Sequence, residues 1–217
     1  MSPRGNILEM AETRSKNRLR RQPLVVIGSS TGGPGTLRRI LAKLPADLPG
    51  TIVIVQHMAE NRIKGLVESL GHEARMALIV AEAGQSLEPH TAYLAPGGRR
   101  NLLIDSGQDG RPTFAIEDAT EEQSYWPSID VLFRSAAAVY KEHLIGILLS
   151  GMGTDGAKGM GAIREAHGVT IAESESTSVV FGMPKNAIDL GVVEMILPNQ
   201  RIPSFLWGQV LSMYEGS

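Results

Sequence analysis

A serine flanked by glycines follows the first strongly apolar run of the sequence. The segment Gly28-Ser29-Ser30-Thr31-Gly32 matches the pattern Gly-x-Ser-x-Gly, with Ser30 at its centre, and a helical pattern follows it. In this context the serine sits on a sharp turn between a strand and a helix, where its hydroxyl is exposed as a nucleophile. The helix N-terminus adds N–H groups that favour a developing negative charge. A glycine- and serine-rich phosphate loop is the alternative for so short a pattern.

Two nucleotide-binding motifs can be tested against the same turn. A dinucleotide fingerprint needs a glycine where Ser30 stands and an acid at the end of the next strand. That strand instead ends in Val55-Gln56-His57-Met58, which contains no acid. A P-loop needs the sequence Gly-Lys followed by Ser or Thr, and the turn lacks it. Nucleotide binding is therefore disfavoured.

Two further strand ends supply the groups that activate a serine. His57 directly follows the second apolar run, and a serine hydroxyl needs a nearby base to act as a nucleophile at neutral pH. Asp155 lies in the glycine-rich turn 150–156, where its carboxylate could orient the imidazole; the alternative is a helix N-cap. Glycines in this turn permit close backbone approach, so the Met152 N–H is a candidate oxyanion donor.

The three side chains follow strands in a chain that alternates strands with helices. Apolar runs and helical periodicity predict strands at 24–27, 51–55, 78–80, 93–95, 145–149, 169–171 and 193–196, a hairpin at 101–105 and 113–117, and helices at 34–43, 62–70, 129–140, 157–166 and 204–214. This alternation predicts an α/β fold with a doubly wound, mostly parallel sheet, helices on both faces and an additional antiparallel hairpin. Such sheets gather functional residues at the carboxyl ends of their strands.

The composition excludes several other classes of protein. The chain has 217 residues, 42% of them hydrophobic, and a formal net charge of −2, which suits one domain with a real core and disfavours a nucleic-acid partner. No apolar run reaches the roughly 18 to 20 residues of a membrane-spanning helix, so no direct membrane insertion is expected. The absence of cysteine excludes disulfides, thiolate nucleophiles and Cys-based metal sites. We expect oxygen or nitrogen chemistry without a metal or cofactor.

The charge is unevenly distributed along the chain. Residues 1–22 contain six Lys or Arg and two acids. Short basic segments of this kind are usually solvated, so we expect a flexible N-terminal arm. Residues 23–217 are expected to form the domain that carries the chemistry.

The order Ser30, His57, Asp155 differs from the order serine, acid, histidine of α/β-hydrolases. The motifs instead resemble the catalytic domain of the chemotaxis methylesterases, the CheB family, over residues 25–197. The resemblance rests on six segments: Ile27 to Gly33, Val55 to Met58, Ala92 to Gly97, Pro127 to Phe133, Gly151 to Gly156 and Val180 to Pro184. It implies Ser30 as nucleophile, His57 as base and Asp155 as the partner of His57. It also implies that Thr31 and Met152 lie close to the reacting carbonyl.

The resemblance further implies a reaction and a partner. Family members remove methyl groups from glutamate side chains of methyl-accepting chemoreceptors in the cytoplasm, which here would release methanol through a glutamyl-enzyme, without a cofactor. Deamidation of receptor glutamines would pass through the same acyl-enzyme. A non-catalytic module that binds receptors or an adaptor through a methylesterase fold is the alternative, and a hydrolase of small free esters is a third hypothesis.

The sequence departs from the family pattern at two motifs and at its N-terminal side. Gly98-Arg99-Arg100 stands where the family has Asp-x-His, and Trp126 stands where it usually has arginine; both positions are expected to line the substrate approach. Family members often carry an N-terminal receiver domain, which 22 residues cannot hold. We therefore expect constitutive activity, control by a separate regulatory protein, or a longer parent chain.

Overall fold

A seven-stranded parallel sheet forms the centre of the structure, a computed structural model that describes residues 22–107 and 110–216. Its strands are β1 (Leu24–Ser29), β2 (Thr51–Gln56), β3 (Ala77–Val80), β4 (Thr91–Leu94), β7 (Leu144–Leu148), β8 (Val169–Glu173) and β9 (Met195–Leu197). They lie in the order β3-β4-β2-β1-β7-β8-β9, and every neighbouring pair is parallel. A separate antiparallel pair consists of β5 (Arg100–Asp105) and β6 (Thr113–Asp118).

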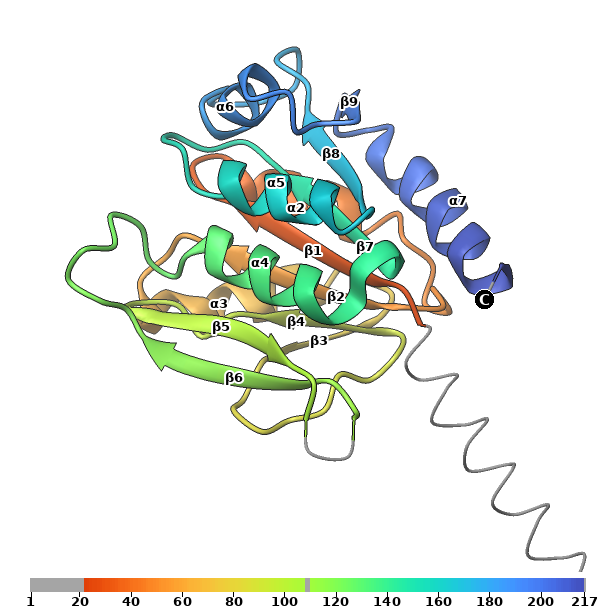
Figure 1. The fold of residues 1–217 in the computed structure, drawn as a ribbon, viewed down its shortest axis with the longest axis horizontal. Coiled ribbons are helices and arrows are strands. Elements are labelled where there is room, and N and C mark those ends of the chain that lie inside the picture. Colours follow the sequence, from red (N-terminus) through yellow and green to blue (C-terminus); the bar gives the residue numbers. More distant parts are fainter. Residues whose placement is uncertain (1–21, 108–109, 217) are drawn as a thin grey trace, which may run out of the picture.

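Helices cover both faces of the sheet (Figure 1). They are α2 (Gly33–Leu41), α3 (Glu60–Gly71), α4 (Ile129–Tyr140), α5 (Ala157–Glu165), α6 (Met183–Asp189) and α7 (Ile202–Glu215), with a short 3₁₀ helix η1 (Lys141–His143). Helices α2, α3 and α7 share one core with the sheet, while α4, α5, α6 and the β5–β6 hairpin share the other. The expected fold class is therefore confirmed.

The residues of β1 show why the central strands are apolar throughout. Leu24 and Val26 join the core under α4, whereas Val25 and Ile27 join the core under α2. All four side chains are fully buried. Because successive side chains point to opposite faces and both faces are covered, the strand carries a continuous apolar run.

The expected elements begin and end within two residues of their predicted bounds, while η1 and α6 were not expected. The strand expected at 193–196 begins later, at Met195, because the preceding backbone binds Thr170: the Glu194 N–H donates to Thr170 Oγ1 at 3.0 Å, and that hydroxyl donates to Val192 O at 2.8 Å. Helix α6 has only seven residues, with proline in its first turn, which is too short for a helical period to stand out.

Two expectations concern the termini and membranes. The basic arm expected at residues 1–22 lies outside the described residues except for Gln22, and the proposed division of the chain stays a prediction. Within ranges 22–107 and 110–216, no helix combines the length and the apolarity that crossing a bilayer requires.

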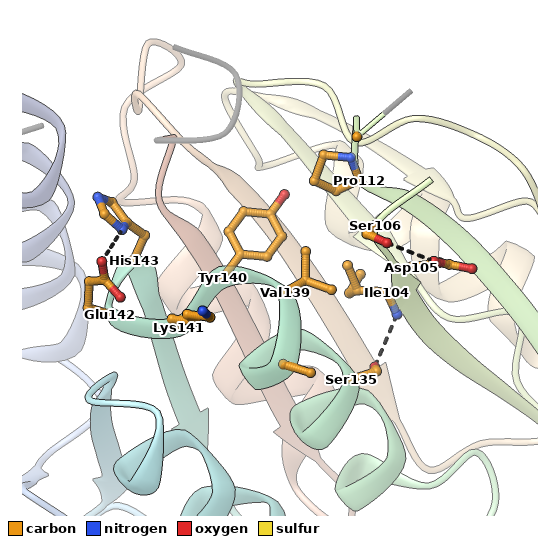
Figure 2. A pocket seen from close by; sticks show the side chains of 12 residues that line it. Ile104, Asp105, Ser106, Pro112, Ser135, Val139, Tyr140, Lys141, Glu142 and His143 are labelled. Carbon is orange, nitrogen blue, oxygen red and sulfur yellow. Dashed lines mark hydrogen bonds and ion pairs between the residues drawn. The ribbon is translucent and has the colours of Figure 1, made fainter. Parts of the chain in front are cut away.

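A hollow of about 850 Å³ lies between the hairpin and the end of α4, and Figure 2 shows the side chains that line it. Ile104 of β5 faces Val139 and Tyr140 of α4 across this space. His143, also in the lining, immediately precedes β7, whereas the Asp155 turn follows the end of β7. The hollow therefore lies at the amino ends of the parallel strands, whereas Ser30, His57 and Asp155 lie at their carboxyl ends.

Helix α2 provides a test of the core behind the Ser30 turn. Leu37 is fully buried there, so Leu37→Ala should lower the free energy of unfolding by about 2–5 kcal/mol, through lost burial and the cavity left behind. Denaturant unfolding followed by circular dichroism measures this change. The control, Arg39→Ala, alters an exposed residue of the same helix and should cost less than about 1 kcal/mol. Equal losses would contradict this packing.

Candidate active site

The Ser30 turn is fixed by backbone hydrogen bonds on both sides. Ser30 is the first residue after β1, and its N–H donates to Ser150 O at 3.0 Å. Its carbonyl oxygen accepts from the Gly33 N–H and from Gln56 Nε2, both at 2.9 Å. Gly32 has a φ of +83°, and a Cβ there would lie 2.6 Å from Val179. The turn therefore needs glycine at this position, and neighbouring strands hold the serine backbone in place.

The turn after β7 closes directly onto Ser30. A Cβ on Gly151 would lie 2.8 Å from the Cβ of Ser30 and 2.3 Å from the sulfur of Met183. Gly151 is therefore small because two neighbouring segments occupy the space of a side chain. This close approach places the 150–156 turn against the serine.

His57 and Asp155 form a buried pair. His57 Nε2 and Asp155 Oδ2 are 2.8 Å apart, and the two side chains are 12% and 3% exposed. The His57 N–H donates to Ser29 O at 3.0 Å, which holds the histidine beside the end of β1. The ring of Tyr125 stacks on the imidazole with 5.5 Å between centroids and an interplanar angle of 8°. The histidine is thus held by its backbone, its ring face and one ring nitrogen.

Asp155 also binds the N-terminus of α4. Its carboxylate accepts from the Ile129 N–H at 2.7 Å, the Asp130 N–H at 3.0 Å and Ser128 Oγ at 3.1 Å. Burial alone would raise the pKa of Asp155, but the hydrogen bonds from His57 and the two amides hold it below its ordinary value of 3.8. The carboxylate stays ionised at neutral pH, so His57 Nε2 carries the proton of their shared hydrogen bond.

Asp155 is not the N-cap of the helix that follows it, but it does bind the N-terminus of another helix. The helix that follows Asp155, α5, has no side-chain cap. Asp155 instead supplies acceptors to the free amides of a helix from another part of the chain, where the helix dipole favours a negative charge.

Sequence reasoning missed several groups around this pair. Ser128 and Tyr125 contact Asp155 and His57 respectively, and Ser128 belongs to a motif that carried the resemblance without a role of its own. Asp130 was also missed. Burial raises the pKa of Asp130, the Gly159 N–H opposes that rise at 2.6 Å, and the charge of Asp155 adds to it.

Thr31 and Met152 lie at the surface of the two turns. Thr31 is exposed and Met152 is 71% exposed. Among the hydrogen bonds of the described residues, neither backbone N–H has an acceptor. The Ser30 N–H, by contrast, is already bound to Ser150 O. The Thr31 and Met152 amides, like those of Gly32 and Gly153 in the same two turns, are therefore not occupied by an acceptor among the described residues.

The structure brings His57 and Asp155 into contact and places Ser30 beside them, but without a hydrogen bond from Ser30 to His57 in the described part of the chain. His57 and Asp155 are hydrogen-bonded, and Ser30 lies against the turn that carries Asp155. No hydrogen bond between Ser30 Oγ and the His57 ring occurs among the described residues. Residues 22–107 and 110–216 also hold no cluster of three or more His, Cys, Asp or Glu side chains that could bind a metal ion.

The family model for CheB methylesterase matches residues 25–206. The chain belongs to the CheB methylesterase family. The solved structure of the Thermotoga maritima CheB methylesterase catalytic domain superposes with a TM-score of 0.81 at 36% identity, covering 86% of this chain and 97% of that one.

Longer CheB relatives show the same likeness. Two are named protein-glutamate methylesterase/protein-glutamine glutaminase. The protein from Symbiobacterium thermophilum is 41% identical over 91% of this chain and 54% of its own length. The protein from Carboxydothermus hydrogenoformans, designated number 1, is 48% identical over 81% and 52%. The chain thus spans about half the length of the curated relatives it matches.

The two motif departures from the CheB pattern meet in space. The Arg99 guanidinium lies 4.3 Å from the centroid of the Trp126 ring, a distance typical of a cation–π contact. Arg100 forms an ion pair with Glu60. Both arginines of the altered motif are therefore engaged with neighbours of their own chain.

The lowered pKa of Asp155 predicts how its contribution to stability varies with pH. An acid whose folded-state pKa is depressed stabilises the fold above its unfolded pKa, and this stabilisation is lost as the pH falls through the folded pKa. Asp155→Asn should therefore be less stable than the wild type at pH 7. The difference should shrink as the pH falls from about 5 toward the folded pKa.

Urea unfolding at a series of pH values measures this difference. Asp47→Asn is the control because Asp47 is exposed, and its stability should stay within about 0.5 kcal/mol of the wild type throughout. A difference for Asp155→Asn that grows on acidification would show that the sign is wrong.

Proposed function

We propose that this chain is a serine hydrolase that demethylates glutamate methyl esters on chemoreceptors. The observation that carries the proposal is the buried His57–Asp155 pair, held beside the turn that presents Ser30. Membership of the CheB methylesterase family supports this chemistry, because the chain shares the fold of a CheB catalytic domain. The names of the relatives, protein-glutamate methylesterase/protein-glutamine glutaminase, support the reaction and a glutamate side chain of a protein as its substrate.

The proton route follows from which imidazole nitrogen is occupied. Asp155 binds His57 Nε2, which leaves the lone pair of Nδ1 as the acceptor for the Ser30 proton. Ser30 Oγ attacks the ester carbonyl as Nδ1 takes that proton. The ionised carboxylate stabilises the imidazolium that forms. The Ser30–His57 hydrogen bond then forms or tightens when substrate binds, as catalytic hydrogen bonds often do.

The negative charge of the tetrahedral intermediate needs donors that no protein group already occupies. The N–H groups of Thr31 and Met152 meet this requirement, and they come from the two turns that flank Ser30. Donors fixed before the reaction stabilise an oxyanion without a reorganisation cost. We assign the oxyanion hole to these two amides.

The remaining steps return the enzyme to its starting state. The bond between the carbonyl carbon and the methoxy oxygen breaks, and methanol leaves with the proton from His57. Water then attacks the glutamyl ester of Ser30 as His57 takes a proton from that water. The bond between the acyl carbon and Ser30 Oγ breaks, His57 returns the proton to Ser30 Oγ, and the glutamate carboxylate is released. A glutamine amide would form the same acyl-enzyme with ammonia as the leaving group. The glutaminase in the relatives' names supports this second activity.

The nucleophile assignment can be tested by methanol release from membranes that carry methylated chemoreceptors. Ser30→Ala should lower the rate at least about 10³-fold, because the attacking oxygen is lost while the binding surface stays intact. Ser204→Ala, at an exposed serine of α7, is the control and should leave the rate unchanged. Methanol release by Ser30→Ala near the control rate would refute the assignment. A wild type that binds receptors without releasing methanol would favour the non-catalytic alternative.

The role of Asp155 makes a separate kinetic prediction. Asp155→Asn should lower kcat by about 10²- to 10⁴-fold with a small change in KM, because the imidazole loses its orientation and the charge that stabilises its protonated form. Steady-state methanol release measures both constants. A change in kcat below about threefold would reduce Asp155 to a cap of α4.

A further inference from the structure

A buried glutamate lies behind the Ser30 turn, outside the groups assigned above. Glu173 ends β8 and is fully buried. Its Oε2 accepts from the Ser150 N–H at 2.9 Å, and its Oε1 accepts from Thr177 Oγ1 at 3.0 Å and Asn199 Nδ2 at 2.9 Å. These donors are all neutral. Burying a carboxylate costs free energy unless hydrogen bonds replace those that it made to water. We therefore expect Glu173 to have a role that accounts for its burial.

Ser150 links that carboxylate to the backbone of the nucleophile turn. Ser150 is itself fully buried. Its carbonyl oxygen accepts from the Ser30 N–H at 3.0 Å, and its hydroxyl donates to Thr31 O at 2.7 Å. The same hydroxyl accepts from the Val180 N–H at 2.9 Å. A single residue therefore separates Glu173 from both Ser30 and Thr31.

The proposed oxyanion hole depends on how the two turns are held relative to each other. The Thr31 amide belongs to the turn after β1, and the Met152 amide to the turn that begins at Ser150. Ser150 binds the first turn directly and starts the second, so fixing its position fixes both donors. An error of about 1 Å in such a geometry can cost about 10²-fold in rate.

We propose that Glu173 is a positioning residue that locks Ser150, and through it the Ser30 turn, into the geometry needed for acyl transfer. This inference rests on the proposed function of the same site. Glu173 acts through Ser150 and touches neither the substrate nor the reacting atoms.

The first variant removes the acceptor and keeps most of the volume. Glu173→Met leaves the Ser150 N–H without its partner, so kcat for methanol release should fall about 10- to 100-fold, with KM within about threefold. The rate at which a fluorophosphonate probe labels Ser30 should fall by a similar factor. That second readout needs the nucleophile and the oxyanion donors but no receptor.

A conservative variant should restore the rate. In Glu173→Gln, the amide oxygen can still accept from the Ser150 N–H. The buried Asn199 Oδ1 has no hydrogen-bond partner among the described residues, so the Asn199 amide can turn and offer this oxygen to the new NH₂ group. We expect kcat and the labelling rate within about threefold of the wild type.

A matched control separates positioning from general destabilisation. Thr177→Val removes a donor to Oε1 and keeps the Ser150 bond to Oε2. It should lower the thermal unfolding midpoint and leave kcat within about threefold. All rates are measured well below the unfolding midpoint of each variant. If Glu173→Met does not fold, Ser150→Ala takes its place: it cuts the hydroxyl link to Thr31 and should lower the labelling rate about tenfold.

The outcomes decide between the two proposals. If the wild type releases no methanol but its Ser30 is labelled, the methylesterase function is refuted. The positioning role of Glu173 is then tested by the labelling rates alone. Labelling of Glu173→Met (or of its substitute Ser150→Ala) within threefold of the wild type would overturn the positioning role. The positioning role would also be overturned if Thr177→Val lost as much labelling rate as Glu173→Met. It would likewise be overturned if Ser30 of the wild type were not labelled.

Discussion

The Asp155 carboxylate is the interaction on which the rest of the site depends. It joins three segments distant in sequence: the turn after β7, the histidine after β2 and the first amides of α4. The α4 amides have no partners within their own helix, and the imidazole needs a fixed acceptor to keep its proton on Nε2. One buried charge satisfies both requirements. The donors that lower the pKa of Asp155 therefore also hold helix α4 and His57 in place relative to each other.

Backbone proximity is the second constraint, and it explains the glycines. Ser30 and Gly151 lie so close that a Cβ on Gly151 would overlap the serine side chain. Parallel strands bring both turns to the same edge of the sheet because β1 and β7 are neighbours. Hydrogen bonds through Ser150 then set the distance between the turns. The sheet thus sets the approximate positions of the turns after β1 and β7, and the hydrogen bonds of Ser150, which Glu173 holds, set their final separation.

Much of this arrangement follows from local patterns in the sequence, and the remainder does not. Continuous apolar runs identify the central strands because both sheet faces are covered, and the strand ends place Ser30, His57 and Asp155 along one edge. Apart from Gly156 and Thr177, which are one and four residues away, the hydrogen-bond partners of Asp155 and Glu173 lie more than 20 residues away in the chain. No periodicity marks them, since their contacts exist only after the sheet has formed. Asp155 is an example: its carboxylate binds both His57 and the first amides of a helix, but that helix is α4 and not the one that follows Asp155 in the chain.

The segment around Trp126 contacts both members of the His57–Asp155 pair. Tyr125 stacks on His57 and Ser128 binds Asp155, so both ends of this short segment hold the His57–Asp155 pair. Between them, Trp126 departs from the family pattern and packs under Arg99, itself part of a second departure. Because the Arg99 guanidinium lies over the Trp126 ring, a substitution at either position changes the surroundings of the other. A substitution at Arg99 or Trp126 would alter the surface beside this segment, while the contacts of Tyr125 with His57 and of Ser128 with Asp155 involve other side chains.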